Sequence, residues 1–454
     1  MKTTQEIRNE YKEFIDNNRE AVIAGMESIK SEEERSALYY DNRCTAKTLA
    51  IPKVYNTDII DSFKGIVTTM HGICEKVISE YVKNPEFRKK FPFSKELEEL
   101  ILTPHGYDML LPMARFDVFF NEETKDFYFC EINTDGTSAM NEDRILKDLF
   151  FDNPAHQYMI RQYDYKSFEL FDSWVKEFLA IYDNFAASKG QATDDVNSSV
   201  KKRINVAVVD FLDIGILKEF KEFARHFQSA GVNCEVCDIR KLRFDGKHLI
   251  SPSGNVIDAV YRRAVTTEII DRLDEVAPFV EAVKNQAFFL CGSFKTQVVH
   301  NKWFFKVLFD EDTKAILTKE ENAFVEAHVP RTVLFSEDTC DIGYVRTHKD
   351  EFILKPMDSY ASNGVYAGAE FNETEWNEKI DSVLSADYIC QDYATQYETE
   401  NVDYAWGDGE FKGYINMPGL YSYGGKFAGV YSRMSDGKII ASHRNERTVP
   451  TYYI

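Results

Sequence analysis

Four polar residues on two adjacent aromatic segments form the most specific chemical pattern in the sequence. Arg115 and Asp117 lie in the first segment, and Glu131 and Asn133 lie in the second, after the polar connection 121–126. Two such segments predict a β-hairpin, and each polar pair would share one face because side chains alternate along a strand. The other face would be apolar, through Phe116, Val118, Cys130 and Ile132. Oxygen ligands of this kind suit Mg²⁺, whereas the alternative is an ordinary solvated hairpin.

The last third of the sequence contains residues suited to binding phosphate groups. Lys302 opens a predicted helix, and Lys355 ends an apolar strand, where a lysine offers a point charge to phosphate. The loop that follows contains Ser362, Asn363 and Gly364. Backbone N–H groups in such a loop can form an anion-binding nest, so this segment is a candidate site for the triphosphate of a nucleotide.

A second apolar strand supplies candidates for binding the nucleotide base. It runs into Gln391, Asp392 and Tyr393, and a segment of this kind can contact adenine through backbone amide and carbonyl groups. Arg433 follows at the end of a later strand. Neither a Gly-x-Gly-x-x-Gly sequence nor a Walker sequence occurs, so a dinucleotide or P-loop site is not predicted.

The hairpin resembles the metal-binding hairpin of the glutathionylspermidine synthases, which have a circularly permuted ATP-grasp fold related to that of eukaryotic glutathione synthetase. The resemblance implies that Asp117, Glu131 and Asn133 hold Mg²⁺, and that Arg115 stabilises the reacting phosphoryl group. The order of the later segments also matches that family, over roughly residues 110 to 454. The positions that fall on the family's later motifs are Lys302, Lys355, Gln391 and Arg433.

Two features depart from the family's pattern. The family's phosphate loop has several glycines, whereas only Gly364 follows Lys355 here, so this loop should be less permissive. Tyr360 in the same loop is expected to contact substrate. Bifunctional members of the family also carry an amidase domain, and no segment here is long enough to be one, so we do not expect amidase activity.

The resemblance and the local patterns together predict an ATP-grasp fold of the glutathione synthetase type, with an inserted α/β domain and a helical N-terminal region. Apolar residues at helical spacing predict helices at 11–30 and 57–81, and Asn56 is the expected N-cap of the second. The polar stretch 190–202 is the expected linker. The four expected regions are a helical N-terminal region (1–108), the metal-binding hairpin and helices of the ATP-grasp core (109–200), the inserted α/β substrate domain (201–295) and the nucleotide-binding lobe (296–454).

The inserted region contains a predicted βαβ unit, with strands at 204–210 and near Val236. A further strand ends in Arg262 and Arg263, and open α/β sheets bind ligands at strand carboxyl ends. These two arginines would therefore meet an acidic substrate or form salt bridges.

Composition excludes several classes of function. The net charge of −21 argues against nucleic-acid binding, and no stretch has the length of a membrane span. The sequence starts without an apolar signal region, so we expect a cytoplasmic protein whose eight cysteines are reduced. Cys234 and Cys237 lie in a predicted strand without a second cysteine pair, so they are expected to be structural.

These patterns predict an ATP-dependent carboxylate–amine ligase that forms an acyl phosphate and releases ADP. Its cofactors would be ATP and one or two Mg²⁺ ions, and its substrates a small peptide or amino-acid carboxylate and an amine. Arg115 and Arg433 would be catalytic. The alternatives are a non-catalytic nucleotide-binding protein of the same fold and a phosphotransferase, and the oligomeric state stays open.

Overall fold

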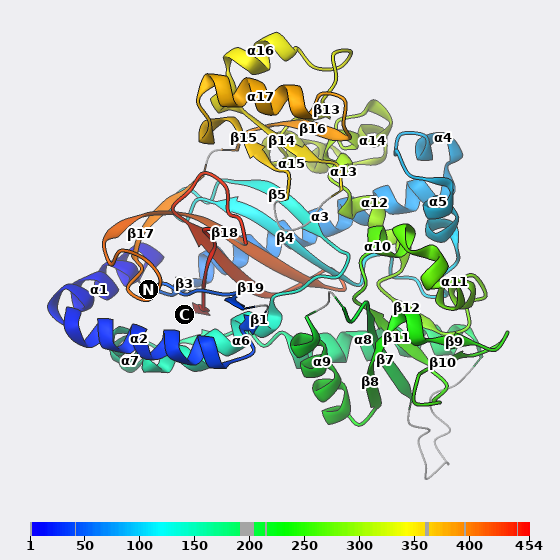
Figure 1. The fold of residues 1–454 in the computed structure, drawn as a ribbon, viewed down its shortest axis with the longest axis horizontal. Helices are drawn as coiled ribbons and strands as arrows, with labels where there is room; N and C mark the ends of the chain where they lie inside the picture. Colours follow the sequence, from blue (N-terminus) through cyan, green and yellow to red (C-terminus); the bar gives the residue numbers. More distant parts are fainter. Residues whose placement is uncertain are drawn as a thin grey trace.

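A six-stranded antiparallel sheet lies at the centre of the computed structural model (Figure 1). The model describes residues 2–40, 42–190, 204–213, 216–358, 363–394, 396–442 and 444–454. The sheet has the order β20-β19-β18-β4-β5, and β17 pairs with β18 outside this path. Its strands are β4 (Met113–Phe120), β5 (Phe127–Asn133), β17 (Glu398–Val402), β18 (Phe411–Tyr423), β19 (Lys426–Ser435) and β20 (Arg447–Val449). The predicted hairpin is thus paired with strands from the end of the chain.

The long helix α3 (Thr57–Lys83) covers one face of this sheet. The predicted N-cap is confirmed, because the Asn56 side chain accepts a hydrogen bond from the backbone N–H of Ile59. Phe63 of α3 is fully buried, and its ring packs edge-on against Tyr55 and Phe120. These apolar contacts hold the sheet against the helix.

The predicted helix at 11–30 is two helices in the structure. α1 (Thr4–Asn17) and α2 (Arg19–Arg35) are separated at Asn18, whose φ of −134° is not helical. The apolar spacing continues across the break because both helices bury one face in the same cluster, together with α7 (Pro154–Gln162). A pattern of burial alone therefore does not reveal the break.

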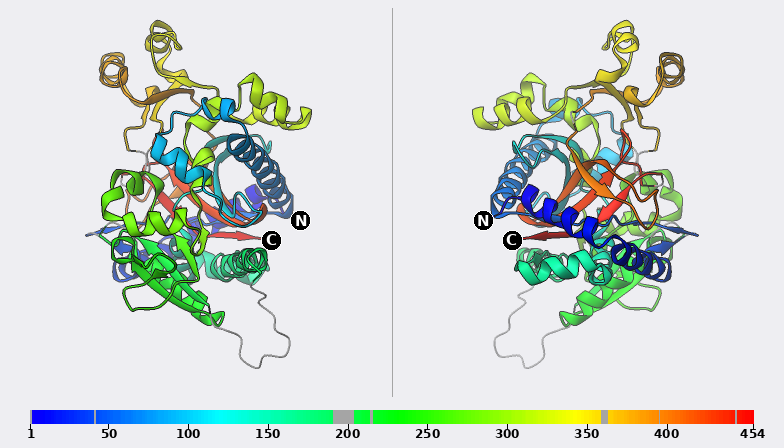
Figure 2. Two further views of the ribbon diagram at one scale, coloured as in Figure 1. Left: turned by 90° about the vertical axis from the view of Figure 1, so that its right-hand side faces the viewer. Right: turned by 90° about the vertical axis from the view of Figure 1, so that its left-hand side faces the viewer.

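A small sheet joins the two ends of the chain. β3 (Lys53–Tyr55) pairs in parallel with β21 (Thr451–Tyr453), which also pairs with β6 (Lys166–Ser167). The two termini accordingly lie near each other in all three views (Figures 1 and 2).

A second, parallel sheet lies below the central one in Figure 1, in the order β12-β11-β7-β8. Helices α8 and α9 bury their aromatic side chains on one face, and α10 and α11 pack on the other. Cys234 and Cys237 lie on β8. The bounds are β7 (Asn205–Asp210), β8 (Asn233–Asp238), β11 (Ala259–Arg262), β12 (Phe289–Cys291), α8 (Phe171–Ser188), α9 (Leu217–Ser229), α10 (Thr266–Asp271) and α11 (Ala277–Lys284). The predicted linker (190–202) lies outside the described residues, except for Gly190.

A third sheet, β13-β16-β14-β15, belongs to a small lobe at the top of Figure 1 (residues 303–392). Helices α16 and α17 cover its outer face, and its inner face is turned toward the central sheet. Its elements are α13 (Trp303–Val307), α14 (Glu311–Ile316), α15 (Lys319–His328), β13 (Thr332–Leu334), α16 (Ile342–Thr347), β14 (Phe352–Pro356), β15 (Tyr366–Ala367), α17 (Glu373–Val383) and β16 (Tyr388–Asp392).

Short elements complete the chain. They are β1 (Tyr39–Tyr40), β2 (Arg43–Cys44), α4 (Pro85–Arg88), α5 (Lys95–Leu102), α6 (Met140–Leu149), β9 (Arg243–Phe244), β10 (Leu249–Ile250) and α12 (Gln297–His300). Among the residues described, no helix combines the length and the apolar character needed to cross a bilayer.

The packing of α3 on the central sheet predicts the effect of a cavity there. Phe63→Ala removes a fully buried ring, so we expect it to lower the free energy of unfolding by about 3–5 kcal/mol. Chemical denaturation measures this loss. Phe151→Ala is the matched control, because the Phe151 side chain is 53% exposed and its loss should cost little. Equal stability of the two variants would contradict the packing described.

Candidate active site

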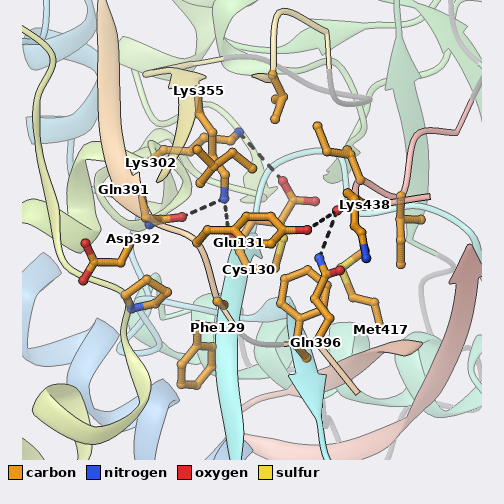
Figure 3. Close-up of a pocket in the computed structure, with 18 of the residues that line it drawn as sticks. Phe129, Cys130, Glu131, Lys302, Lys355, Gln391, Asp392, Gln396, Met417 and Lys438 are labelled. Carbon is orange, nitrogen blue, oxygen red and sulfur yellow. Dashed lines mark hydrogen bonds and ion pairs between the residues drawn. The ribbon is translucent and has the colours of Figure 1, made fainter. Parts of the chain in front are cut away.

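A cleft lies between the inner face of the small lobe and the central sheet (Figure 3). Both sides contribute to it, because β5, β18 and β19 supply one wall and β14 and β16 supply the other. Its lining contains both polar and apolar side chains. Its polar lining includes Glu131, Lys302, Lys355, Gln391 and Arg433, and its apolar lining includes Ile353, Val365, Met417, Ile439 and Ile440.

The hairpin that supplies the cleft contains a β-bulge. Arg115 pairs with Asn133 and Asp117 with Glu131, but Val118 then pairs with Phe129, so Cys130 is an extra residue on β5. The prediction that Cys130 faces the apolar core is therefore wrong. The bulge reverses the alternation of β5, so that Phe129 packs in the core at the border of the cleft and Cys130 lines the cleft instead of joining that core.

Asp117 is the most heavily engaged side chain of the hairpin. It is completely buried, and its carboxylate accepts hydrogen bonds from Arg115 Nε at 2.7 Å and Arg115 Nη2 at 3.0 Å. It also accepts from Asn133 Nδ2 at 2.8 Å and from Arg433. The carboxylate of one buried aspartate therefore holds two guanidinium groups that come from different strands.

Glu131, in contrast, reaches the cleft. Its Oε2 lies 3.8 Å from Nζ of Lys302, and its Oε1 accepts a hydrogen bond from Asn133 at 3.4 Å. Burial would raise the pKa of Glu131, but the charges of Lys302, Arg433 and Arg115 outweigh it and hold the pKa well below its usual range. Glu131 therefore places an ionised carboxylate in the cleft.

Lys355 is the second cation of the cleft, and it is almost fully buried. Its Nζ donates to Gln391 Oε1 at 2.7 Å and to the carbonyl of Cys130 at 3.3 Å, a carbonyl that the bulge places there (Figure 3). Gln391 in turn donates to Thr332 at 2.8 Å. Burial lowers the pKa of Lys355, so an anion beside its ammonium group would be strongly favoured.

In the strand end predicted to contact adenine, two backbone N–H groups already form hydrogen bonds within the protein. The backbone N–H of Asp392 donates to the carbonyl of Arg331 at 3.0 Å, and that of Tyr393 donates to the carbonyl of Glu351 at 2.7 Å. Both residues nevertheless line the cleft, and Ala394 lies beside them. A base in this cleft would thus meet Ala394 and the carbonyl oxygens of this segment more readily than these two amides.

The predicted phosphate loop is described only at its end. Tyr360 and Ser362 lie outside the described residues, whereas Asn363 and Gly364 are within them. Gly364 has φ of +71°, and a Cβ there would lie 2.6 Å from the Tyr388 hydroxyl, so this turn requires glycine. Val365, directly after it, lines the cleft.

Arg262 and Arg263 are buried in ion pairs away from the cleft. Arg262 Nη2 lies 2.7 Å from Asp135, and Arg263 Nη2 lies 2.9 Å from Glu219. Both guanidinium groups also donate to backbone carbonyl groups, including that of Gly292. Of the two roles expected for them, the structure shows salt bridges, and these attach the parallel sheet to the segment after β5 and to α9.

Several lining residues of the cleft were not predicted from the sequence. They include Phe119, Gln396, Met417, Lys438, Ile439 and Ile440. Apolar residues on strands have the same sequence pattern whether they line a ligand-binding cleft or pack in a hydrophobic core. Knowledge of the bulge next to Glu131 would have indicated that Phe119 and Cys130 line the cleft. Bulges, however, have no clear sequence signature outside the glycine-containing types.

One solved structure resembles this architecture over nearly its whole length. The glutathione synthetase-like effector from Globodera pallida, in its apo form, aligns with a TM-score of 0.60 over 96% of this chain and 97% of that chain, at 11% sequence identity. This chain has an ATP-grasp fold. The predicted fold class is therefore confirmed.

Other solved structures align less well. A putative γ-glutamylcysteine synthetase from Methylobacillus flagellatus KT gives a TM-score of 0.34 at 8% identity, over 88% of this chain and 89% of that chain. The D-cycloserine synthetase DcsG gives 0.29 at 19% identity, over 47% and 68%. No protein-family model and no curated protein matches the sequence.

The buried aspartate predicts a specific loss of stability. Asp117→Ala would leave two buried guanidinium groups without their anion, which typically costs about 3–5 kcal/mol. Denaturation by urea measures this cost. Glu410→Ala is the control, since the Glu410 side chain is 74% exposed and its removal should leave stability nearly unchanged. An Asp117→Ala protein as stable as the wild type would exclude this role for Asp117.

A pH dependence follows from Glu142 on α6. Its Oε2 accepts a hydrogen bond from the Tyr431 hydroxyl at 2.6 Å, and burial raises the pKa of Glu142 to about 7. The folded state therefore prefers the protonated form, and this stabilisation is complete below pH 4.5 and is lost as the pH rises through 7. Glu142→Gln should accordingly gain stability relative to the wild type between pH 5 and pH 8, roughly the window of this titration. Denaturation curves at several pH values test this, and a constant difference would contradict it.

Proposed function

We propose that this protein is an ATP-dependent carboxylate–amine ligase that forms an acyl phosphate and releases ADP. One observation carries the proposal. Two cations, Lys302 and Lys355, line a cleft in an ATP-grasp fold together with the anionic Glu131. Cations with a hard oxygen ligand are the groups that bind a nucleotide triphosphate together with Mg²⁺.

The two kinds of side chain that line the cleft suit the two parts of ATP. The adenine ring would pack between side chains of the two sheets, such as Ile353 and Met417, because flat apolar groups favour this environment. The phosphates would extend toward Lys355 and Lys302. The hydrogen bond from Lys355 to Gln391 holds its ammonium group in place before the nucleotide arrives.

The donor set of the hairpin fits Mg²⁺. Glu131 would be the principal ligand because it already lies in the cleft, and Asn133 and Asp117 stand next to it on the same hairpin. Asp117 can bind Mg²⁺ only if Arg115 or Arg433 gives up a hydrogen bond to one of its carboxylate oxygens. When bound, Mg²⁺ would neutralise charge on the β- and γ-phosphates.

The two arginines would have different roles. Arg433 lines the cleft, and its Nε is buried without a hydrogen-bond partner among the described residues, so it has a donor for a phosphoryl or tetrahedral oxygen. Arg115 does not line the cleft; it donates to Asp117 and to the carbonyl of Ser138 at 3.0 Å. It would therefore orient Asp117, which in turn positions Arg433.

In the proposed reaction the substrate carboxylate attacks the γ-phosphate, giving an acyl phosphate and ADP. The amine then attacks the acyl carbon and phosphate leaves, so no covalent enzyme intermediate is needed. We propose a small peptide or amino-acid carboxylate as the acid. The substrates of glutathionylspermidine synthases are one such pair, and Tyr360 stays a candidate contact from the sequence alone.

A screen of carboxylic acids with and without amines tests the proposal. We expect release of ADP and phosphate that requires both substrates, and we expect Lys355→Ala to lower the rate about a hundredfold or more through loss of a charge on the transferring group. Glu131→Ala should abolish turnover, and the exposed Lys284→Ala should be unaffected.

The products separate the alternatives. AMP and pyrophosphate would exclude the acyl-phosphate mechanism. Release of ADP without any amine, together with a stable phosphorylated acid, would identify a phosphotransferase. Nucleotide binding without turnover across the screen would favour a non-catalytic binding protein.

A further inference from the structure

A second pocket lies beside α5, at the right of Figure 1, and is separate from the cleft. Its walls come from the C-terminal ends of α3, α5 and α8, from the loop 103–110, and from the turn Phe294–Thr296 that precedes α12. No described residue lines both this pocket and the cleft. Its volume of about 470 Å³ is that of a small-molecule site.

Lys295 supplies a buried cation to this pocket. The residue is only 4% exposed, and its Nζ donates to the carbonyl oxygen of Ile101 at 2.9 Å and to that of Thr103. These carbonyl groups lie at the C-terminal end of α5, where helix carbonyls lack partners within the helix, so Lys295 caps α5. An ammonium group has three N–H donors, and the cap therefore leaves one of them for a ligand.

The charge of Lys295 has no carboxylate partner among the residues that the structure describes, and burial alone lowers its pKa to about 8. Asp108 is the acidic residue of the lining, and it is exposed to solvent. An anion next to a buried ammonium group favours its charged form and offsets the cost of burying it. The pocket thus has an uncompensated positive charge at its wall.

His105 shares this lining with Lys295 and has an unused ring nitrogen. Its Nε2 is buried and has no hydrogen-bond partner within the described part of the chain. The ring packs edge-on against Tyr107, with the ring centroids 4.2 Å apart. Burial and the charge of Lys295 lower the pKa of His105 to about 4, so the ring is neutral near pH 7. A buried nitrogen without a partner costs free energy, which a polar group of a ligand would recover.

The rest of the lining selects the kind of anion. The described lining contains no arginine, the side chain best suited to binding phosphate through two hydrogen bonds, and Lys83 is exposed. One spare ammonium proton beside a neutral imidazole suits a single negative charge. Apolar surface lies next to these groups and would pack against an apolar ligand body; it comes from Val82, Leu102, Tyr107 and Leu110.

We propose that this pocket is a second ligand site, which binds a small monocarboxylic acid with an apolar body. The carboxylate accepts the spare N–H of Lys295, and the apolar body packs against the side chains of α3, α5 and the loop 103–110. A hydroxyl group of the ligand, where it has one, pairs with Nε2 of His105. The cap on α5 and the ligand then use all three donors of one ammonium group.

Isothermal titration calorimetry of the full chain with acetate, hexanoate and benzoate tests the proposal. We expect hexanoate and benzoate to bind, and acetate to bind more weakly because it buries less apolar surface. Benzamide has the shape of benzoate without its charge, so it should bind at least about tenfold more weakly, as expected for a lost hydrogen bond to a charged group. Inorganic phosphate should also bind more weakly than benzoate.

Variants locate the binding site. Lys295→Met should weaken benzoate binding at least about tenfold, whereas Lys64→Met, the same change at a 56% exposed lysine of α3, should leave it unchanged. Lys355→Ala, in the cleft, should bind benzoate as the wild type does. Should Lys295→Met fail to fold because α5 loses its cap, Val82→Trp replaces it, since its larger side chain would fill the pocket from the wall.

Three results would overturn the proposal. They are no binding of hexanoate or benzoate at about 10 mM, binding of benzamide or phosphate as tight as that of benzoate, and undiminished benzoate binding by Lys295→Met or, in its place, Val82→Trp. Loss of benzoate binding in Lys355→Ala would likewise assign the carboxylate to the cleft instead. These measurements do not depend on whether the protein is a ligase.

Discussion

The carboxylate of Asp117 is the constraint on which the candidate site depends. It lies on β4, and it holds Arg115 from the same strand and Arg433 from β19, with β18 between them in the sheet. A buried ion cluster of this kind is costly unless every charge is matched, so the strands can meet only in the register that matches them. The register in turn places Glu131 opposite Asp117, at the wall of the cleft.

This arrangement separates the residues that support the site from those that would touch a ligand. Arg115, Asp117 and Asn133 form the supporting layer, and Glu131 and Arg433 are the groups of the same network that reach the cleft. The bulge at Cys130 also supports the site, because it directs the carbonyl oxygen of Cys130 toward the ammonium group of Lys355. Polar groups that are fully matched before a ligand binds need little rearrangement afterwards.

Sequence reasoning succeeded where the local chain alone determines structure. The β4–β5 hairpin itself, the N-cap at Asn56 and the apolar spacing of α3 are set by neighbouring residues. Sequence reasoning failed where contacts with segments distant in the sequence determine the structure. The break at Asn18 preserves the burial pattern, and the bulge at Cys130 has no signature in the residues around it. The partners of Arg262 and Arg263 come from segments distant in sequence, so no local pattern could distinguish substrate contacts from buried salt bridges.

The pairing of β3 with β21 has a consequence for how the chain acquires its structure during synthesis. β3 is made early, and its partner strand leaves the ribosome only after all three large sheets have been translated. The central sheet has the same property, since β4 pairs with β18. Contacts between such distant segments make folding slow, and the early apolar helices must wait for their final partners with part of their surface uncovered. A nascent chain of this topology therefore keeps part of its apolar surface uncovered until β18 and β21 have been translated.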